Sequence, residues 1–168
     1  SGVKGRPCDG VSQESPLLLG PGPPTPLAPP DSSSAAISLR EPSRLPPMFT
    51  VFKDFSFSAA HQIRGHQGGC QNLHGHNYRV RVYVRARELD GLGMVIDFAD
   101  LKKIVAAVVD PFDHQYLNDI PPFNERNTTA ELLSQYIFDE IGKRLPARRE
   151  LTRVEVWETD SSCAVYEA

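Results

Sequence analysis

The sequence contains no run of about 18 apolar residues, the length that a membrane-spanning helix requires. An excess of basic residues is also missing, because 18 Lys and Arg stand against 21 Asp and Glu and give a net charge of -3. Phosphate binding calls for a strongly basic surface. We therefore expect neither a membrane nor a nucleic acid among the partners of this chain.

Cysteine is scarce, with only Cys8, Cys70 and Cys163 in 168 residues. An odd number of widely spaced cysteines does not form a disulfide framework. Free thiols are typical of a reducing compartment, so we expect a cytoplasmic protein.

Aromatic residues are absent from residues 1–47, which hold 11 of the 15 prolines. Such a segment offers few large apolar side chains for a core. We expect residues 1–47 to be a disordered Pro-rich tail or a non-native extension, and residues 48–168 to fold as one domain. The chain begins with Ser1, and Met48 directly precedes the first strand-like run, so Met48 is a candidate for the natural start.

Apolar residues recur with the period of strands in four stretches. These are residues 49–60, 77–87, 151–158 and 163–166. In residues 77–87 the valines share one face and the arginines the other, as in a half-buried antiparallel strand. Asp90-Gly91 indicates a hairpin, with residues 94–96 as the returning strand.

Two stretches have the period of helices instead. Residues 98–109 form an apolar stripe that Asp97 can cap, and Pro111 ends it. Thr128 and Glu131 match a capping box, with Thr128 as the N-cap residue of a second helix. The pattern predicts an α+β domain whose antiparallel sheet carries helices on one face.

Five histidines fall between residues 61 and 114. His74 and His76 are two residues apart, so in a strand they face the same side and reach one metal ion. His61, at the end of the first strand, is a third ligand. Three neutral imidazoles with an open fourth position are typical of catalytic zinc. In the alternative interpretation, His-Gly-His is a polar entry to a loop.

Further candidates have two or three interpretations each. Cys70 is a base or nucleophile, if a nearby cation lowers its pKa, a fourth zinc ligand, or a plain buried cysteine. Asp113-His114 is a proton relay or a solvated pair. Glu158 shares the inward face of its strand and can bind two donors in a row, unless the strand ends at Trp157.

Together these residues resemble the 6-pyruvoyl-tetrahydropterin synthase superfamily, most closely its bacterial 6-carboxy-tetrahydropterin synthase branch. The resemblance runs from about Met48 to Glu167, and the Cys-x-x-x-His spacing of Cys70 and His74 is that of the carboxy-type enzymes. Six ordered motifs carry it: Phe57-Ser-Ala-Ala-His61, Cys70-Gln-Asn-Leu-His74-Gly-His76-Asn, Gly93-Met-Val-Ile-Asp97-Phe-Ala-Asp-Leu-Lys102, Phe112-Asp-His114-Gln-Tyr-Leu-Asn118, Asn127-Thr-Thr-Ala-Glu131 and Val156-Trp-Glu158-Thr. Asn127-Thr128-Thr129 departs from the Asn-Pro-Thr of many bacterial members.

The resemblance implies the tunnelling fold, a four-stranded antiparallel sheet with two helices on one face. Trimers of that fold close a β-barrel, two trimers stack into a homohexamer, and the active site lies between subunits. It also implies a role for each candidate residue. Zn²⁺ is bound by His61, His74 and His76; Cys70 is the proton acceptor, assisted by Asp113, His114 and Glu158; Glu158 anchors the pterin ring, and Thr128, Thr129 and Glu131 line its pocket.

The implied reaction converts 7,8-dihydroneopterin triphosphate to 6-carboxy-5,6,7,8-tetrahydropterin, with release of acetaldehyde and triphosphate, on the route to queuosine. Two alternatives remain open. One is a pyruvoyl-type synthase that removes triphosphate and leaves the carbon chain whole. The other is a non-catalytic protein in which zinc is structural and Cys70 is its fourth ligand.

Overall fold

Four long antiparallel strands and one very short strand form the sheet of the computed structural model, which describes residues 20, 22 and 47–168. The strand order is β3-β1-β2-β4-β5. The strands are β1 (Phe49–His61), β2 (His74–Ala86), β3 (Gln115–Tyr116), β4 (Glu150–Thr159) and β5 (Ser162–Glu167). The short strand β3 was not predicted, and it pairs in parallel with the end of β1. Apart from Gly20, Gly22 and Pro47, the predicted tail lies outside the described residues.

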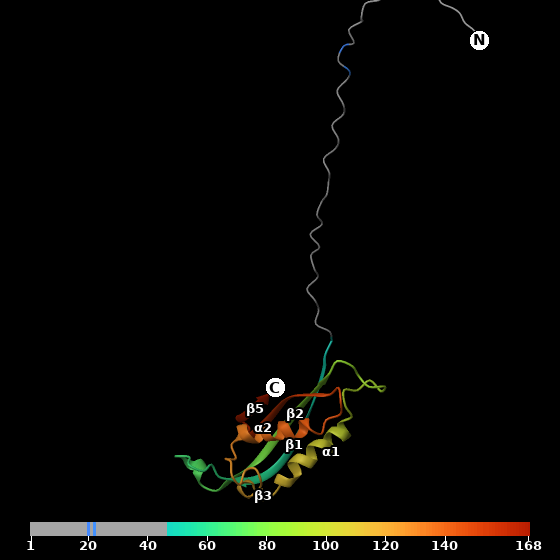
Figure 1. The fold of residues 1–168 in the computed structure, drawn as a ribbon. Coiled ribbons are helices and arrows are strands. Elements are labelled where there is room, and N and C mark those ends of the chain that lie inside the picture. The colour runs from blue at the N-terminus through green and yellow to red at the C-terminus, as the bar shows by residue number, and fades with distance from the viewer. Residues whose placement is uncertain (1–19, 21, 23–46) are drawn as a thin grey trace, which may run out of the picture. The chain divides into compact units, whose positions relative to one another are not determined.

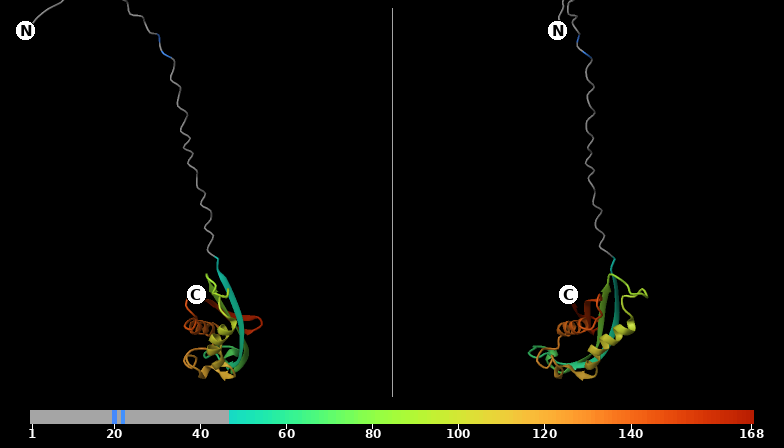
Figure 2. Two further views of the ribbon diagram at one scale, coloured as in Figure 1. Left: turned by 90° about the vertical axis from the view of Figure 1, so that its right-hand side faces the viewer. Right: turned by 45° about the vertical axis from the view of Figure 1, so that its right-hand side comes forward.

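Helices α1 (Phe98–Val109) and α2 (Ala130–Gly142) lie on one face of the sheet, as Figures 1 and 2 show. Helix α2 packs along β4 and β5 and also contacts α1. Single turns of 3-10 helix connect the larger elements. They are η1 (Gly69–Gln71), η2 (Asp110–Phe112) and η3 (Leu117–Asp119). The predicted α+β sheet with two helices on one face is confirmed. No helix in the described range is long and apolar enough to cross a membrane.

The alternation of β2 determines which face becomes the core. Tyr78, Val80, Val82 and Val84 are completely buried against the helices. The residues between them face the other side of the sheet, where Arg81 makes a bidentate pair with Asp54 at 2.6 and 2.8 Å. The same inward face continues past Tyr78 to His76 and His74, so the core face of the sheet ends in histidines.

The predicted returning strand at residues 94–96 is wrong. The Asp90 carboxylate accepts hydrogen bonds from the backbone N–H groups of Leu92 and Met94, each at 2.9 Å, and the Asp90 N–H donates to the Met94 carbonyl. These bonds close a compact turn that ends at Met94, and residues 94–96 form no strand. Val95 and Ile96 are buried as part of this loop.

The predicted start of the second helix is wrong by one residue. Thr129 is the N-cap residue, and its hydroxyl accepts a hydrogen bond from the Leu132 N–H at 3.3 Å. Glu131 therefore lies in the first turn without closing a capping box with Thr128. The Thr128 hydroxyl is unavailable for capping because it bonds to His61 and Gln62.

Candidate functional site

The register of β1 and β2 brings three histidines together at one end of the sheet. His61 lies directly opposite His74, and His76 lies opposite Ala59, two positions further along the same face. One ring nitrogen of each histidine lies within 4.8 Å of the others. Zinc bonds of about 2.1 Å in a tetrahedron require about 3.4 Å between ligand nitrogens, which small side-chain rotations supply. The predicted triad therefore forms a candidate metal centre.

Backbone carbonyl groups determine which nitrogens of His61 and His74 are free. A carbonyl oxygen can only accept, so the His61 Nδ1–H donates to the Thr128 carbonyl at 2.9 Å, and the His74 Nδ1–H donates to the Asn72 carbonyl at 2.8 Å. The Nε2 atoms of both rings then carry lone pairs. Holding a ligand histidine through its other nitrogen is usual in metal sites.

His61 Nε2 is a buried nitrogen that bonds to no other group in the described part of the chain. The residue is 1 % exposed, and burial lowers the pKa of the His61 imidazole to about 4, although the hydrogen bond to Thr128 acts in the opposite direction. His61 is therefore neutral at pH 7. A buried, neutral and unsatisfied acceptor next to two further imidazoles fits a cation.

A pocket of about 490 Å³ opens over the triad. It brings the exposed Cys70 and the half-buried Glu158 to the histidines, together with Thr129 and Glu131. Glu158 Oε1 lies 3.9 Å from His61 Nε2. Strand β4 continues to Thr159, so the alternative in which it ends at Trp157 is wrong.

The negative charge of Glu131 affects the pKa of Glu158 in this pocket. Burial raises the pKa of the Glu158 carboxyl, the charge of Glu131 raises it further, and His76 acts in the opposite direction. A carboxylate in these surroundings is stabilised by a ligand that offers two hydrogen-bond donors in a row.

Thr128 does not line the pocket. It is completely buried, and its hydroxyl lies 3.1 Å from His61 Nδ1 and donates to the Gln62 carbonyl at 3.3 Å. Its place is behind the metal centre, where it holds His61. Thr129 and Glu131 do line the pocket, as expected of residues that contact a substrate.

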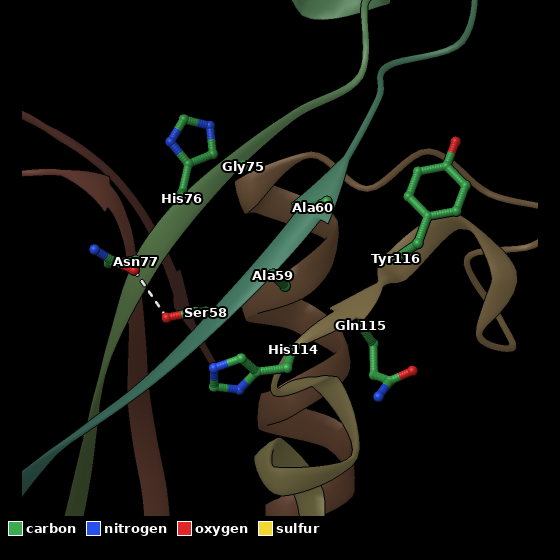
Figure 3. Close-up of a pocket in the computed structure, with 9 residues that line it drawn as sticks. All are labelled: Ser58, Ala59, Ala60, Gly75, His76, Asn77, His114, Gln115 and Tyr116. Carbon is green, nitrogen blue, oxygen red and sulfur yellow. Dashed lines mark hydrogen bonds between the residues drawn. The ribbon is translucent and has the colours of Figure 1, made fainter.

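The structure does not bring Asp113 and His114 to the pocket of Cys70. His114 lines a separate pocket of about 530 Å³, in which β1 runs between the His114 and His76 side chains (Figure 3). The Asp113 carboxylate lies 2.9 Å from His114 Nδ1 and accepts a hydrogen bond from the Ser58 N–H, a bond that lowers the pKa of this carboxyl. His114 adopts a φ of 57°, rare for a non-glycine residue.

Sequence reasoning missed Tyr78 as part of the site. Its ring lies 5.8 Å from that of His61 and 5.5 Å from that of His76, between centroids. Its hydroxyl is buried and has no hydrogen-bond partner among the described residues, and burial raises the pKa of the phenol. Tyr78 shares one face of β2 with His74 and His76, and this alternation could have indicated its place beside them. The buried core residues of β2 share the same face, however, so the alternation alone does not distinguish Tyr78 from the core.

Comparison with known proteins gives the chain its family. The family model for 6-pyruvoyl tetrahydropterin synthase matches residues 50–168. The 6-carboxy-5,6,7,8-tetrahydropterin synthase of Haemophilus influenzae is 36% identical over 145 residues, which cover 71% of this chain and 99% of that protein. The 6-pyruvoyl tetrahydrobiopterin synthase of Homo sapiens is 38% identical over 130 residues, with coverages of 69% and 89%.

A solved structure agrees with these sequence matches. The 6-pyruvoyl tetrahydropterin synthase of Caenorhabditis elegans superposes with a TM-score of 0.65 and 33% sequence identity, over 73% of this chain and 96% of that one. The resemblance inferred from the six motifs is thereby confirmed. This chain belongs to the 6-pyruvoyl tetrahydropterin synthase family.

Proposed function

We propose that this protein is a zinc-dependent lyase that converts 7,8-dihydroneopterin triphosphate and one water molecule to 6-carboxy-5,6,7,8-tetrahydropterin, acetaldehyde and triphosphate. The observation that carries the proposal is the convergence of His61, His74 and His76 in the pocket that also holds Cys70 and Glu158. The names of bacterial relatives at 35 to 40% identity support the carboxy-type product.

The donor set fits Zn²⁺. Three neutral imidazoles without a fourth protein ligand are typical of catalytic zinc, and the buried lone pair of His61 Nε2 lacks any other partner within residues 47–168. His61, His74 and His76 would hold the ion. When bound, zinc supplies Lewis acidity toward hydroxyl or carbonyl oxygens of a substrate.

The other residues of the pocket would bind the substrate and move its protons. Cys70 lies on the exposed η1 turn at the pocket, where its thiolate would accept a proton from the substrate side chain. Glu158 would anchor the guanidine-like edge of the pterin ring through two parallel hydrogen bonds. Such anchoring orients the reacting carbons, and correct orientation lowers an activation barrier by roughly several kcal/mol.

Asp113 and His114 would act on Cys70 from a neighbouring subunit, because within one chain His114 lines a different pocket and Asp113 is paired with it. This proposal requires the homohexamer of two stacked trimers that the resemblance implies. We place the enzyme in the cytoplasm, on the route to 7-deazaguanines such as queuosine.

A pyruvoyl-type synthase is the main alternative. The human and nematode proteins carry that name and are 38% and 33% identical to this chain. Such an enzyme would remove triphosphate and keep the carbon side chain, so the carbon products separate the two activities.

A structural zinc site closed by Cys70 is the second alternative. The group of donor atoms within 4.8 Å of one another consists of the three imidazoles, and among the described residues it does not include the Cys70 thiol. This geometry favours an open fourth position.

Metal analysis of the wild type and of His74→Ala tests the proposed site. We expect about one zinc ion per wild-type chain and turnover of dihydroneopterin triphosphate, and loss of both in His74→Ala. His66→Ala is the matched control for zinc content, because His66 is exposed and lies outside the ligand group although it lines the same pocket. Zinc content at neutral pH that is the same in His74→Ala as in the wild type would contradict the assignment.

A further inference from the structure

The segment that follows β1 connects the metal ligand His61 to the loop that carries Cys70. Residues 62 and 63 follow the end of β1, Arg64 begins a turn in which the His66 N–H donates to the Ile63 carbonyl at 3.3 Å, and none of the three pairs with a strand in the described part of the chain. Their backbone groups nevertheless all need partners if the segment is to keep one position. The partners come from two loops that lie on opposite edges of the segment.

Two asparagine side chains replace a strand on one edge. Asn118 Oδ1 accepts a hydrogen bond from the Gln62 N–H at 2.9 Å, and its Nδ2 donates to the Gln62 carbonyl at 2.9 Å. Asn127 does the same for Arg64, at 2.9 and 3.1 Å. The two amides thus satisfy both backbone groups of Gln62 and both of Arg64, which a pairing strand would otherwise do.

The other edge reaches Cys70. The Ile63 N–H, which lies between the two pairs, donates to the Cys70 carbonyl at 2.7 Å. Residues 62–64 therefore influence two parts of the site. They follow His61 directly in the chain, and through Ile63 they bond to the η1 turn that carries the Cys70 thiol.

Arg64 holds the loop that supplies the asparagines. Its guanidinium donates to the carbonyl groups of Asn118, Phe123 and Arg126, each at 3.1 Å. A guanidinium presents several donors in a fixed plane, so one side chain can join three carbonyls that are distant in sequence. The loop that is held in this way ends at Thr128, whose carbonyl orients His61.

We propose that Asn127 and Arg64 are positioning residues that set the metal affinity of the site by fixing His61 relative to its partner ligands. The proposal rests on the metal centre described under the proposed function. Loss of either side chain leaves residues 62–64 free to shift, and the His61 Nε2 atom then spends part of its time outside the ligand geometry. Loss of a group that orients a metal ligand typically weakens metal binding by about 10- to 100-fold.

Zinc affinity of the purified full chain, measured by competition with a chromophoric chelator, tests this proposal. We expect Asn127→Ala and Arg64→Ala to raise the zinc dissociation constant about 10- to 100-fold. Asn124→Ala and Arg126→Ala are the matched controls: both residues are exposed in the same loop, and their side chains take no part in these contacts. The controls are expected to keep wild-type affinity.

A destabilised variant elsewhere in the chain separates positioning from general loosening of the fold. Asp97→Ala removes the N-cap bond of α1 and none of the contacts to residues 62–64, so its zinc dissociation constant should equal that of the wild type. If Asn127→Ala fails to fold, Asn127→Asp takes its place, since it keeps the acceptor for the Arg64 N–H and loses only the donor. Equal weakening of zinc binding in Asp97→Ala and in Asn127→Ala would overturn the positioning role.

The His74→Ala variant separates this proposal from the metal site itself. Zinc binding that is as tight in His74→Ala as in the wild type would contradict the metal centre. Zinc binding that depends on His74 but is equally tight in Asn127→Ala and Arg64→Ala would overturn the positioning role alone.

Discussion

His61 is held in a single tautomer by groups that the protein itself supplies. The Thr128 carbonyl binds Nδ1–H, and burial keeps the ring neutral, so the lone pair of Nε2 faces the pocket before any ligand arrives. His74 is prepared in the same way by the Asn72 carbonyl. A site preorganised by such bonds loses little free energy to rearrangement when it binds an ion.

Burial of a neutral His61 makes the metal-free protein sensitive to acid. An unfolded histidine titrates near 6.5, whereas the pKa of folded His61 is about 4, so the unfolded chain binds the additional proton as the pH falls between these values. The zinc-free protein should therefore lose about 1 kcal/mol of unfolding free energy through His61 between pH 7 and pH 5.5. Urea denaturation at the two values measures this loss.

His61→Ala provides the comparison for this pH dependence, because it should lose the part that His61 contributes, about 1 kcal/mol between the two pH values. A wild type whose unfolding free energy is the same at both pH values would mean that His61 has the same pKa in the folded and the unfolded chain.

Cys70→Ala distinguishes a catalytic thiol from a structural ligand. The exposed thiol lies outside the group of imidazoles, so its removal should leave the fold and the zinc content unchanged. Turnover should fall by about 10²- to 10⁴-fold, the usual contribution of a group that transfers protons. Loss of zinc together with unfolding would instead support the structural alternative.

At the scale of elements, the alternation of inward and outward residues along the strands was the basis for predicting both the core and the histidine triad. The parity of β2 predicted that His74 and His76 continue the buried face, and the pairing with β1 places His61 beside them. The errors arose where side chains bind backbone. The Thr128 hydroxyl donates to the carbonyl of Gln62, which is 66 residues away, so local pattern does not reveal this bond. The Asp90 bonds to the Leu92 and Met94 N–H groups are local, but an Asp-Gly pair is common to tight hairpins and to such turns, so the pattern did not separate the two.

The N-cap of α2 is testable by stability. Thr129→Ala removes the hydroxyl that accepts the Leu132 N–H and should cost about 1 kcal/mol of unfolding free energy, as N-cap truncations do. Asp97→Ala, at the N-cap of α1, should cost a similar amount, since Asp97 accepts from the Ala99 N–H. Urea denaturation of both variants measures the losses, and an unchanged stability of Thr129→Ala would place the helix start elsewhere.

At the scale of the whole molecule, the chain carries two parts of the proposed site in different pockets. Cys70 lines the pocket of the histidine triad, whereas the exposed His114 lines a second pocket that shares His76 with the first. The sequence did not predict this separation, because it depends on how Asp113 and His114 bond to Ser58 of β1 in the folded chain. Within residues 47–168, β1 has no strand partner on this edge beyond its short pairing with β3, and such an edge can pair with a strand of another chain.

Mixed oligomers test whether the site is completed by a neighbour. Cys70→Ala and His114→Ala should each be nearly inactive, and refolding them together should restore part of the activity by bringing an intact Cys70 to an intact His114. Native mass spectrometry with one subunit isotopically labelled confirms that mixed oligomers form. Mixed oligomers without recovered activity would indicate that each chain contains its whole site.

The identity of the carbon products tests the central claim most directly. The zinc-loaded protein is incubated with 7,8-dihydroneopterin triphosphate, and the pterin and the volatile aldehyde are identified by mass spectrometry, with His74→Ala as the inactive control. The account predicts 6-carboxy-5,6,7,8-tetrahydropterin, acetaldehyde and triphosphate in equal amounts. A pterin that retains its three-carbon side chain, formed without acetaldehyde, would contradict it.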